Sequence, residues 1–176
     1  MSTNDRDMGM GQGQAHNTEI RLATLADLDA LVSLEVACFA VPWSRKSFEA
    51  EVHGNSFSQL LVVPGPMELP GIPLLAYSCV WVIFEEIRFL NLAVHPQFRG
   101  QGLAKRLIHH ALCIGSTQGC CRGMLEVRAS NQPARNLYES FNFKEYGTRT
   151  SYYTNPIEDA ILMNLEPISK PISDKK

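Results

Sequence analysis

The segment from residue 91 to residue 105 restricts the fold more than any other part of the chain. It starts with an apolar run typical of a strand end, passes Pro96, and enters a predicted helix through Gly100 and Gly102. Glycines let main-chain N–H groups approach an anion closely, and the start of a helix adds unsatisfied donors and a partial positive charge. The segment therefore predicts a phosphate or pyrophosphate site at a strand-to-helix turn.

Two other phosphate-binding motifs compete with this interpretation. Gly100-Gln101-Gly102 begins like the dinucleotide fingerprint G-x-G-x-x-G, but Lys105 stands in place of the third glycine. The spacing of a P-loop is missing as well. Taken alone, the segment is also consistent with a glycine-rich turn that binds no ligand.

Hydrophobic periodicity predicts one domain over residues 18–167, with Thr24 and Ser44 as the N-caps of its first two helices. Strands are expected at residues 18–23, 56–63, 74–84, 87–94, 124–128, 144–153 and 159–165. Helices are expected at residues 24–36, 44–52, 102–115 and 133–141. Because strands cluster instead of alternating strictly with helices, the order favours an α/β (α+β) fold with a mixed sheet flanked by helices.

Size, charge and cysteine content narrow the class of protein. A chain of 176 residues suits one packed domain, and we expect residues 1–17 to form a disordered leader and residues 168–176 a loose tail. The formal net charge of −2, without a block of Lys or Arg, argues against a nucleic acid or a membrane as the direct partner. The five cysteines lack C-x-x-C spacing and sit mostly in apolar stretches. A cytoplasmic protein is expected.

Several motifs resemble a known family. Arg99-x-x-Gly102-x-Ala104, directly after Leu92-Ala93-Val94, is similar to the acyl-CoA motif of the GNAT acetyltransferase superfamily. Leu125-Glu126-Val127-Arg128 and Leu137-Tyr138-Glu139-Ser140 resemble its RimI group, which acetylates the N-terminal alanine of a ribosomal protein. The resemblance covers roughly residues 19–166 and implies a mixed, mostly antiparallel sheet of about seven strands flanked by about four helices.

Some residues depart from the pattern of this group. Val41 stands where Phe is usual, and the Pro-rich loop at residues 64–73 is longer than expected. Asn142 replaces a glycine, but Asn tolerates the left-handed conformation that this helix end requires.

The resemblance also implies a binding site for acetyl-CoA as cosubstrate. Main-chain groups at the strand end would hold the pantetheine and acetyl groups, and amides at the helix start would take the pyrophosphate. The implied cofactor-binding residues are Leu92, Ala93, Val94, Arg99, Gly100, Gln101, Gly102, Leu103, Ala104, Lys105 and Asn131. A cap on the following helix is the second interpretation of Asn131. No metal is expected, because His109 and His110 are adjacent and cannot share one helix face.

Acetyl transfer to an amine requires a proton acceptor for the amine and a proton donor for the departing thiolate. Glu126 lies in an otherwise apolar strand, where partial burial would make it a better proton acceptor, and we assign it as general base. The alternative is an ordinary ion pair with Arg128 or another cation. The ordinary pKa of a tyrosine, about 10, is of the same order as that of the leaving thiol, and we assign Tyr138 as general acid. The alternative is that its ring only packs.

The resemblance implies a protein N-terminus as acceptor, with Trp43, Tyr152 and Tyr153 lining its groove; core or edge packing is the alternative for these three residues. An α-amine with a pKa of about 8 is far more often neutral near pH 7 than a lysine with a pKa of about 10.4. The resemblance implies a small-subunit ribosomal protein that begins with Ala. A small amine or a lysine side chain is the alternative acceptor, and a non-catalytic acyl-CoA-binding module is the alternative class.

Overall fold

A computed structural model of the chain describes residues 19–66 and 71–168. The predicted leader lies outside the described residues, and so does the predicted tail except for Ile168. Seven strands form one sheet in the order β1-β2-β3-β4-β5-β7-β6. Neighbouring strands are antiparallel apart from the parallel pair β4 and β5. The predicted mixed, mostly antiparallel sheet is confirmed.

The strands and helices lie close to their predicted positions. The strands are β1 (Arg21–Leu22), β2 (Ser58–Pro64), β3 (Leu74–Ile83), β4 (Glu86–Val94), β5 (Arg122–Arg128), β6 (Lys144–Thr154) and β7 (Ile157–Leu165). The helices are α1 (Leu28–Cys38), α2 (Arg45–Glu49), α3 (Leu103–Thr117) and α4 (Gln132–Glu139). Short helical turns occur at η1 (Leu25–Asp27), η2 (Ala50–Gly54) and η3 (Pro96–Phe98).

Local signals in the sequence account for several boundaries. The Asp27 carboxylate accepts a hydrogen bond from the Thr24 N–H at 2.8 Å, and the Ser44 hydroxyl accepts one from the Ser47 N–H at 3.1 Å. Asn142 is left-handed with φ 65°, as predicted. The β3–β4 turn is shifted by one residue, because Glu86 belongs to β4 and pairs with both Ile83 and Arg122.

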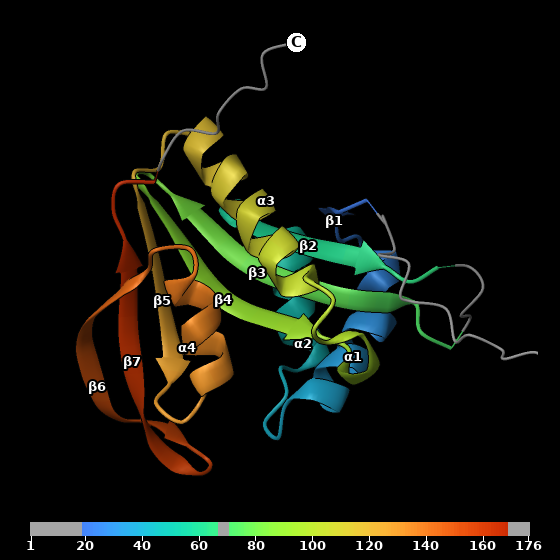
Figure 1. Cartoon of the computed structure of the whole chain (residues 1–176). Coiled ribbons are helices and arrows are strands. Elements are labelled where there is room, and N and C mark those ends of the chain that lie inside the picture. The colour runs from blue at the N-terminus through green and yellow to red at the C-terminus, as the bar shows by residue number, and fades with distance from the viewer. Residues whose placement is uncertain (1–18, 67–70, 169–176) are drawn as a thin grey trace, which may run out of the picture.

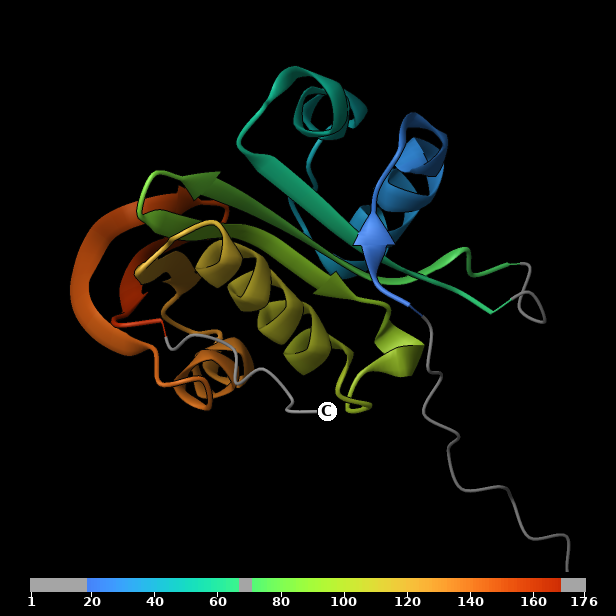
Figure 2. The same cartoon turned by 90° about the horizontal axis from the view of Figure 1, so that it is seen from above.

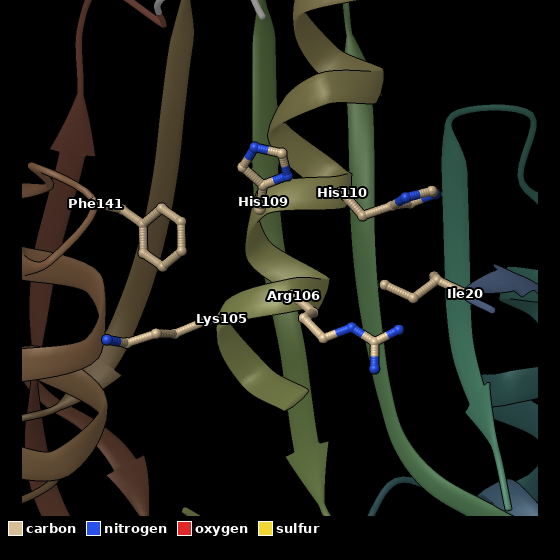
Figure 3. Close-up of a pocket in the computed structure, with 6 residues that line it drawn as sticks. All are labelled: Ile20, Lys105, Arg106, His109, His110 and Phe141. Atoms are coloured by element: carbon tan, nitrogen blue, oxygen red, sulfur yellow. The ribbon is translucent and has the colours of Figure 1, made fainter. Parts of the chain in front are cut away.

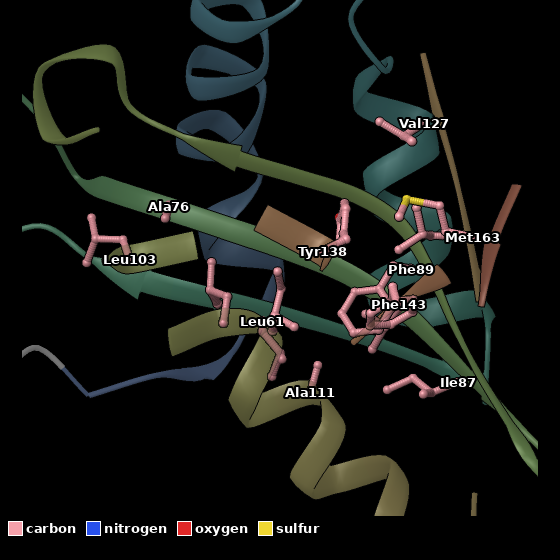
Figure 4. Packing of buried hydrophobic residues seen from close by; sticks show 14 of the residues in the cluster. Leu61, Ala76, Ile87, Phe89, Leu103, Ala111, Val127, Tyr138, Phe143 and Met163 are labelled. Carbon is pink, nitrogen blue, oxygen red and sulfur yellow. The ribbon is translucent and has the colours of Figure 1, made fainter. Parts of the chain in front are cut away.

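The helices cover both faces of the sheet. Helices α1 and α2 lie on one face, and α3 and α4 lie on the other (Figure 2). Strand β2 alternates between the two cores: Leu61 and Val63 pack in the α3 and α4 core, while Leu60 and Val62 pack against α1 and α2. Phe89, Tyr138 and Phe143 meet in the α3 and α4 core (Figure 4). The sheet is therefore buried on both sides at its middle.

Strands β4 and β5 part halfway along their length. Their parallel pairing runs from Glu86 opposite Arg122 to Phe89 opposite Leu125, although β4 continues to Val94. In the pairing of β3 with β4, the register shifts between Cys79 and Val80, so that Leu90 is an extra residue in β4. Such a bulge bends a strand and increases its twist. The bulge accompanies the divergence of the two strands seen in Figure 1.

Gly123 in β5 allows the close approach of a core ring. A Cβ atom at this position would lie 2.9 Å from Cζ of Phe143, which is only 2% exposed. Because a buried ring has little room to move, we expect Gly123→Ala to lower the free energy of unfolding by about 1–3 kcal/mol. Gly54→Ala is the control, since no atom lies within 4 Å of its Cβ position. Urea denaturation tests the pair, and equal stability of the two variants would contradict the packing argument.

Candidate active site

The opening between β4 and β5 exposes main-chain groups that the sheet does not use. The Leu92 N–H donates to Oδ1 of Asn91 at 3.0 Å instead of to β3. The Val94 carbonyl accepts from Nε of Arg99 at 3.2 Å and from Sγ of Cys38 at 3.4 Å. These groups point to the side that β5 has left. Both groups are paired with nearby side chains and not with β5.

The predicted anion cradle follows directly after β4. Gly100 and Gly102 have φ values of 77° and 80°, in the left-handed region that favours glycine. Gly102 is the N-cap of α3 and provides no side-chain cap for the helix. The first-turn amides of α3 therefore lie at a helix start that a bound anion can cap. The side chain of Arg99 turns back to the Val94 carbonyl, away from this role.

The backbone at Gly102 should matter for coenzyme A affinity. Alanine should relax from the left-handed conformation, and returning to it for binding costs about 1–2 kcal/mol, so we expect Gly102→Ala to weaken coenzyme A binding by up to about tenfold. Gly119→Ala is the matched control, because Gly119 has φ 90° but lies after the far end of α3. Titration calorimetry should give weaker binding for the first variant only. Equal affinities in the two variants would argue against the cradle.

A hollow of about 450 Å³ continues from the cradle along α3. Its cationic side chains come from the outer surface of this helix, and Figure 3 shows Lys105 extending on the side of Phe141, and Arg106 and His110 on the side of Ile20. The hollow does not include Glu126 or Tyr138. It therefore extends the positively charged surface of the anion cradle and is separate from the strand opening.

Glu126 lies beside the strand opening with a cation and a phenol as neighbours. Its carboxylate is 2.9 Å from Nη1 of Arg149, and its side chain is 36% exposed. A hydrogen bond to this carboxylate raises the pKa of Tyr152, and the Arg149 guanidinium lies 4.8 Å from the centre of the Tyr152 ring. The ion pair expected as an alternative is thus formed, but with Arg149 in place of Arg128. Glu126 is also less enclosed than its apolar strand suggested.

Tyr138 is buried in the α3 and α4 core. Its ring centre lies 6.0 Å from that of Phe89 and 5.6 Å from that of Phe143. Burial raises the pKa of Tyr138 well above the ordinary value, so the phenol is protonated near neutral pH. Leu125 and Val127 belong to the same core. By strand alternation, Glu126 faces the opposite side of the sheet from Tyr138.

The remaining predicted residues lie around the same opening. Oδ1 of Asn131 accepts the Ala134 N–H at 3.2 Å, which confirms Asn131 as the N-cap of α4. This bond leaves the donor hydrogens of its amide group for the predicted contact with pantetheine. Burial raises the pKa of Tyr153 to about 12, and Tyr153 interacts electrostatically with both Glu126 and Tyr138. Tyr153 therefore lies between Glu126 on one side of the sheet and Tyr138 on the other.

The acceptor side carries an aromatic pair and a half-buried tryptophan. The rings of Tyr152 and Tyr153 meet edge to face at 5.2 Å, and Tyr152 is 43% exposed. The ring of Trp43 packs at 5.6 Å from Phe48, in the core on the α1 and α2 face. These rings provide apolar surface on the side of the sheet that Glu126 faces.

Sequence reasoning missed Glu35, a polar residue that borders this site. Glu35 is only 1% exposed, and its carboxylate accepts a hydrogen bond from Nδ2 of Asn91 at 3.1 Å. The signal was present in the helical period, because Glu35 follows Leu31 by four residues and so shares its buried face. A carboxylate on an apolar helix face requires polar partners elsewhere in the fold.

The mixed sheet that opens between β4 and β5 beside a glycine-rich helix start has the fold of an N-acetyltransferase of known structure. Within that class, the chain belongs to the acetyltransferase (GNAT) family, whose model matches residues 28–143. The chain is accordingly an acetyl-CoA-dependent N-acetyltransferase. None of the helices within residues 19–66 and 71–168 combines the length and hydropathy that crossing a lipid bilayer requires.

Three matches illustrate the similarity. The ribosomal protein bS18-alanine N-acetyltransferase of Escherichia coli strain K12 is 37% identical over 155 residues, which cover 87% of this chain and 99% of that protein. The crystal structure of the ribosomal-protein-S18-alanine N-acetyltransferase from Escherichia coli matches with a TM-score of 0.77 at 32% identity, covering 90% of this chain and 99% of that chain. Arabidopsis thaliana NAA60 in complex with acetyl-CoA shares the fold, with a TM-score of 0.76, 18% identity, and coverage of 85% and 98%.

Proposed function

We propose that this protein acetylates the N-terminal α-amine of another protein, a ribosomal protein that begins with Ala. The observation that carries the proposal is the opening between β4 and β5, with Glu126 on one face of the sheet and Tyr138 on the other. A proton acceptor on the side of the amine and a proton donor on the side of the thiol are what a direct transfer requires. The sequence and structure matches from Escherichia coli, which are named for alanine N-acetylation of a ribosomal protein, support this acceptor.

Each group of the site has a role in this reaction. Amides between Gly100 and Lys105 would hold the pyrophosphate of the cosubstrate, and a main-chain N–H of the strand end from Leu92 to Val94 would polarise the thioester carbonyl. Glu126, directly or through a water molecule, takes the proton of the attacking amine as the N–C bond forms. Tyr138 gives its proton to the sulfur as the C–S bond breaks. No covalent enzyme intermediate is needed.

The acceptor would enter from the face that carries α1 and α2. Glu126 faces this side, and Trp43, Tyr152 and Tyr153 offer aromatic surface for the first residues of a peptide. An α-amine with a pKa of about 8 is partly neutral near pH 7, so a carboxylate that is 36% exposed can serve as its base.

Peptides with varied first residues test the acceptor directly. We expect mass spectrometry to find one added acetyl group at the N-terminus of peptides that begin with Ala, and faster reaction than with other first residues. The control is the same peptide with a blocked N-terminus and an internal lysine. Acetylation of this control would indicate a lysine acetyltransferase. Binding of acetyl-CoA without turnover of any amine would indicate the non-catalytic module.

A further inference from the structure

The buried carboxylate of Glu35 lies between the two halves of the proposed site. Helix α1 carries it into the core beneath the sheet, where it is 1% exposed. A charged group in such a place is stable only when hydrogen-bond donors surround it. The identity of those donors therefore shows what the carboxylate holds in place.

Three donors from three parts of the chain meet at Glu35. Oε1 accepts the main-chain N–H of Trp43 at 2.9 Å and Nδ2 of Asn91 at 3.1 Å. Oε2 accepts the hydroxyl of Tyr77, which is fully buried in β3. Asn91 in turn accepts the Leu92 N–H through its Oδ1 at 3.0 Å. One carboxylate oxygen thus links Trp43 on the acceptor side to Leu92 on the acetyl side.

We propose that Glu35 is a positioning residue that sets the spacing between the acceptor groove at Trp43 and the strand end that begins at Leu92, whose main-chain groups would hold the acetyl group. The part of this inference that concerns the acceptor rests on the proposed function. Small errors in such a spacing have large effects on rate, because the attacking amine and the thioester carbon must meet in a narrow range of geometries. Neither Glu35 nor Asn91 contacts the reacting atoms in this proposal.

The direction of the hydrogen bonds makes the proposal testable. In Glu35→Gln one carboxylate oxygen becomes an NH₂ group. At the position shared by Trp43 and Asn91 it would face two donors, and at the other position it would require the Tyr77 hydroxyl to accept a hydrogen bond instead of donating one. If the Asn91 amide flipped, its oxygen could accept from the NH₂ of the new glutamine side chain. Its own NH₂ would then face the Leu92 N–H, which is also a donor. In Asn91→Asp both side-chain oxygens are acceptors, one for the NH₂ of the new glutamine side chain and one for the Leu92 N–H. The double variant therefore restores the link between positions 35 and 91 but leaves the Trp43 N–H without its acceptor.

Kinetics with an amine that the wild type acetylates should separate positioning from stability. We expect Glu35→Gln to lower kcat by at least about tenfold and to raise KM for the acceptor, with unchanged affinity for coenzyme A. Asn91→Asp alone places two carboxylates together and should be at least as damaging. In the double variant, kcat should recover to within about threefold of the wild type while KM for the acceptor stays raised.

Tyr77→Phe is the matched control, because it removes one hydrogen bond to Glu35 and leaves the ring packed edge to face at 5.4 Å from Phe48. It should lower the melting temperature and keep kcat within about twofold. If kcat instead follows the melting temperature across all variants, or if the double variant does not recover, Glu35 is only structural and the proposal is overturned.

A readout without an acceptor separates this inference from the proposed function. In ¹⁵N–¹H spectra with coenzyme A bound, the amide resonances of Leu92 and Trp43 should both shift in Glu35→Gln, and the double variant should restore that of Leu92 alone. A wild type that acetylates no peptide N-terminus, with this spectral pattern intact, would contradict the proposed acceptor but not the positioning role. Unshifted resonances in Glu35→Gln would contradict the positioning role itself.

Discussion

Glu126→Gln is expected to lower kcat for acetyl transfer by about 10²- to 10⁴-fold, the usual contribution of a positioned general base. Gln keeps the shape of the side chain but cannot take a proton from the amine. The Glu126–Arg149 ion pair is largely exposed, with 36% of Glu126 and 52% of Arg149 accessible, so its loss should change stability little. Steady-state kinetics with an Ala-starting peptide, together with calorimetry of acetyl-CoA binding, measure the two effects separately.

Glu145→Gln is the control for this experiment. Glu145 in β6 also forms an exposed ion pair, at 3.4 Å from Arg135, but it lies in the strand at the edge of the sheet. Its substitution should leave kcat unchanged. Unchanged turnover in Glu126→Gln would mean that another group, or water alone, takes the proton, and our assignment of the base would be wrong.

Tyr138→Phe is the second large effect, and we expect a fall in kcat of at least about 10²-fold. The substitution removes only the hydroxyl, so the ring contacts with Phe89 and Phe143 should persist and the protein should stay folded. Without the phenol, the thiolate must leave without a proton from the enzyme. The rate should therefore fall with little change in KM for either substrate, which steady-state kinetics can measure.

The pH dependence should have a definite direction. The phenol acts in its protonated form, and burial raises the pKa of Tyr138 above its ordinary value of about 10. Activity that depends on this proton is therefore retained as the pH rises toward 10. Tyr146→Phe, at a tyrosine that is 52% exposed in β6, is the control and should leave kcat unchanged. A wild-type activity that declines between pH 8 and 9 and does so equally in Tyr138→Phe would assign that decline to another group.

Much of the fold was predictable because its signals are local. The period-2 pattern of β2 sorts Leu61 and Val63 from Leu60 and Val62, and the structure places the two pairs in opposite cores. The hydroxyl of Ser44 and the amide of Asn131 cap the helices that follow them. Such signals involve only neighbours along the chain. The β3–β4 turn was misplaced by one residue, although the pairing of Ile83 with Glu86 that closes it is local.

The candidate site was less predictable, because its geometry depends on residues far apart in the sequence. Glu126 could be named as a candidate, but its partner Arg149 comes from a strand that reaches it only through β7. The three hydrogen bonds to Glu35 span up to 56 residues of chain. The roles of Glu126 and Tyr138 remain predictions.

By itself, the sequence determined which residues can bind an anion and which can move a proton. Left-handed glycines, helix caps and apolar periods follow from the conformational preferences of single residues and their neighbours, and no tertiary contact is needed to recognise them. Only the tertiary structure decided that β4 and β5 separate after Phe89, that Glu126 and Tyr138 lie on opposite faces of the sheet, and that Glu35 joins the two sides. Strand pairing and burial depend on the whole packed chain, so no local pattern specifies where a sheet opens.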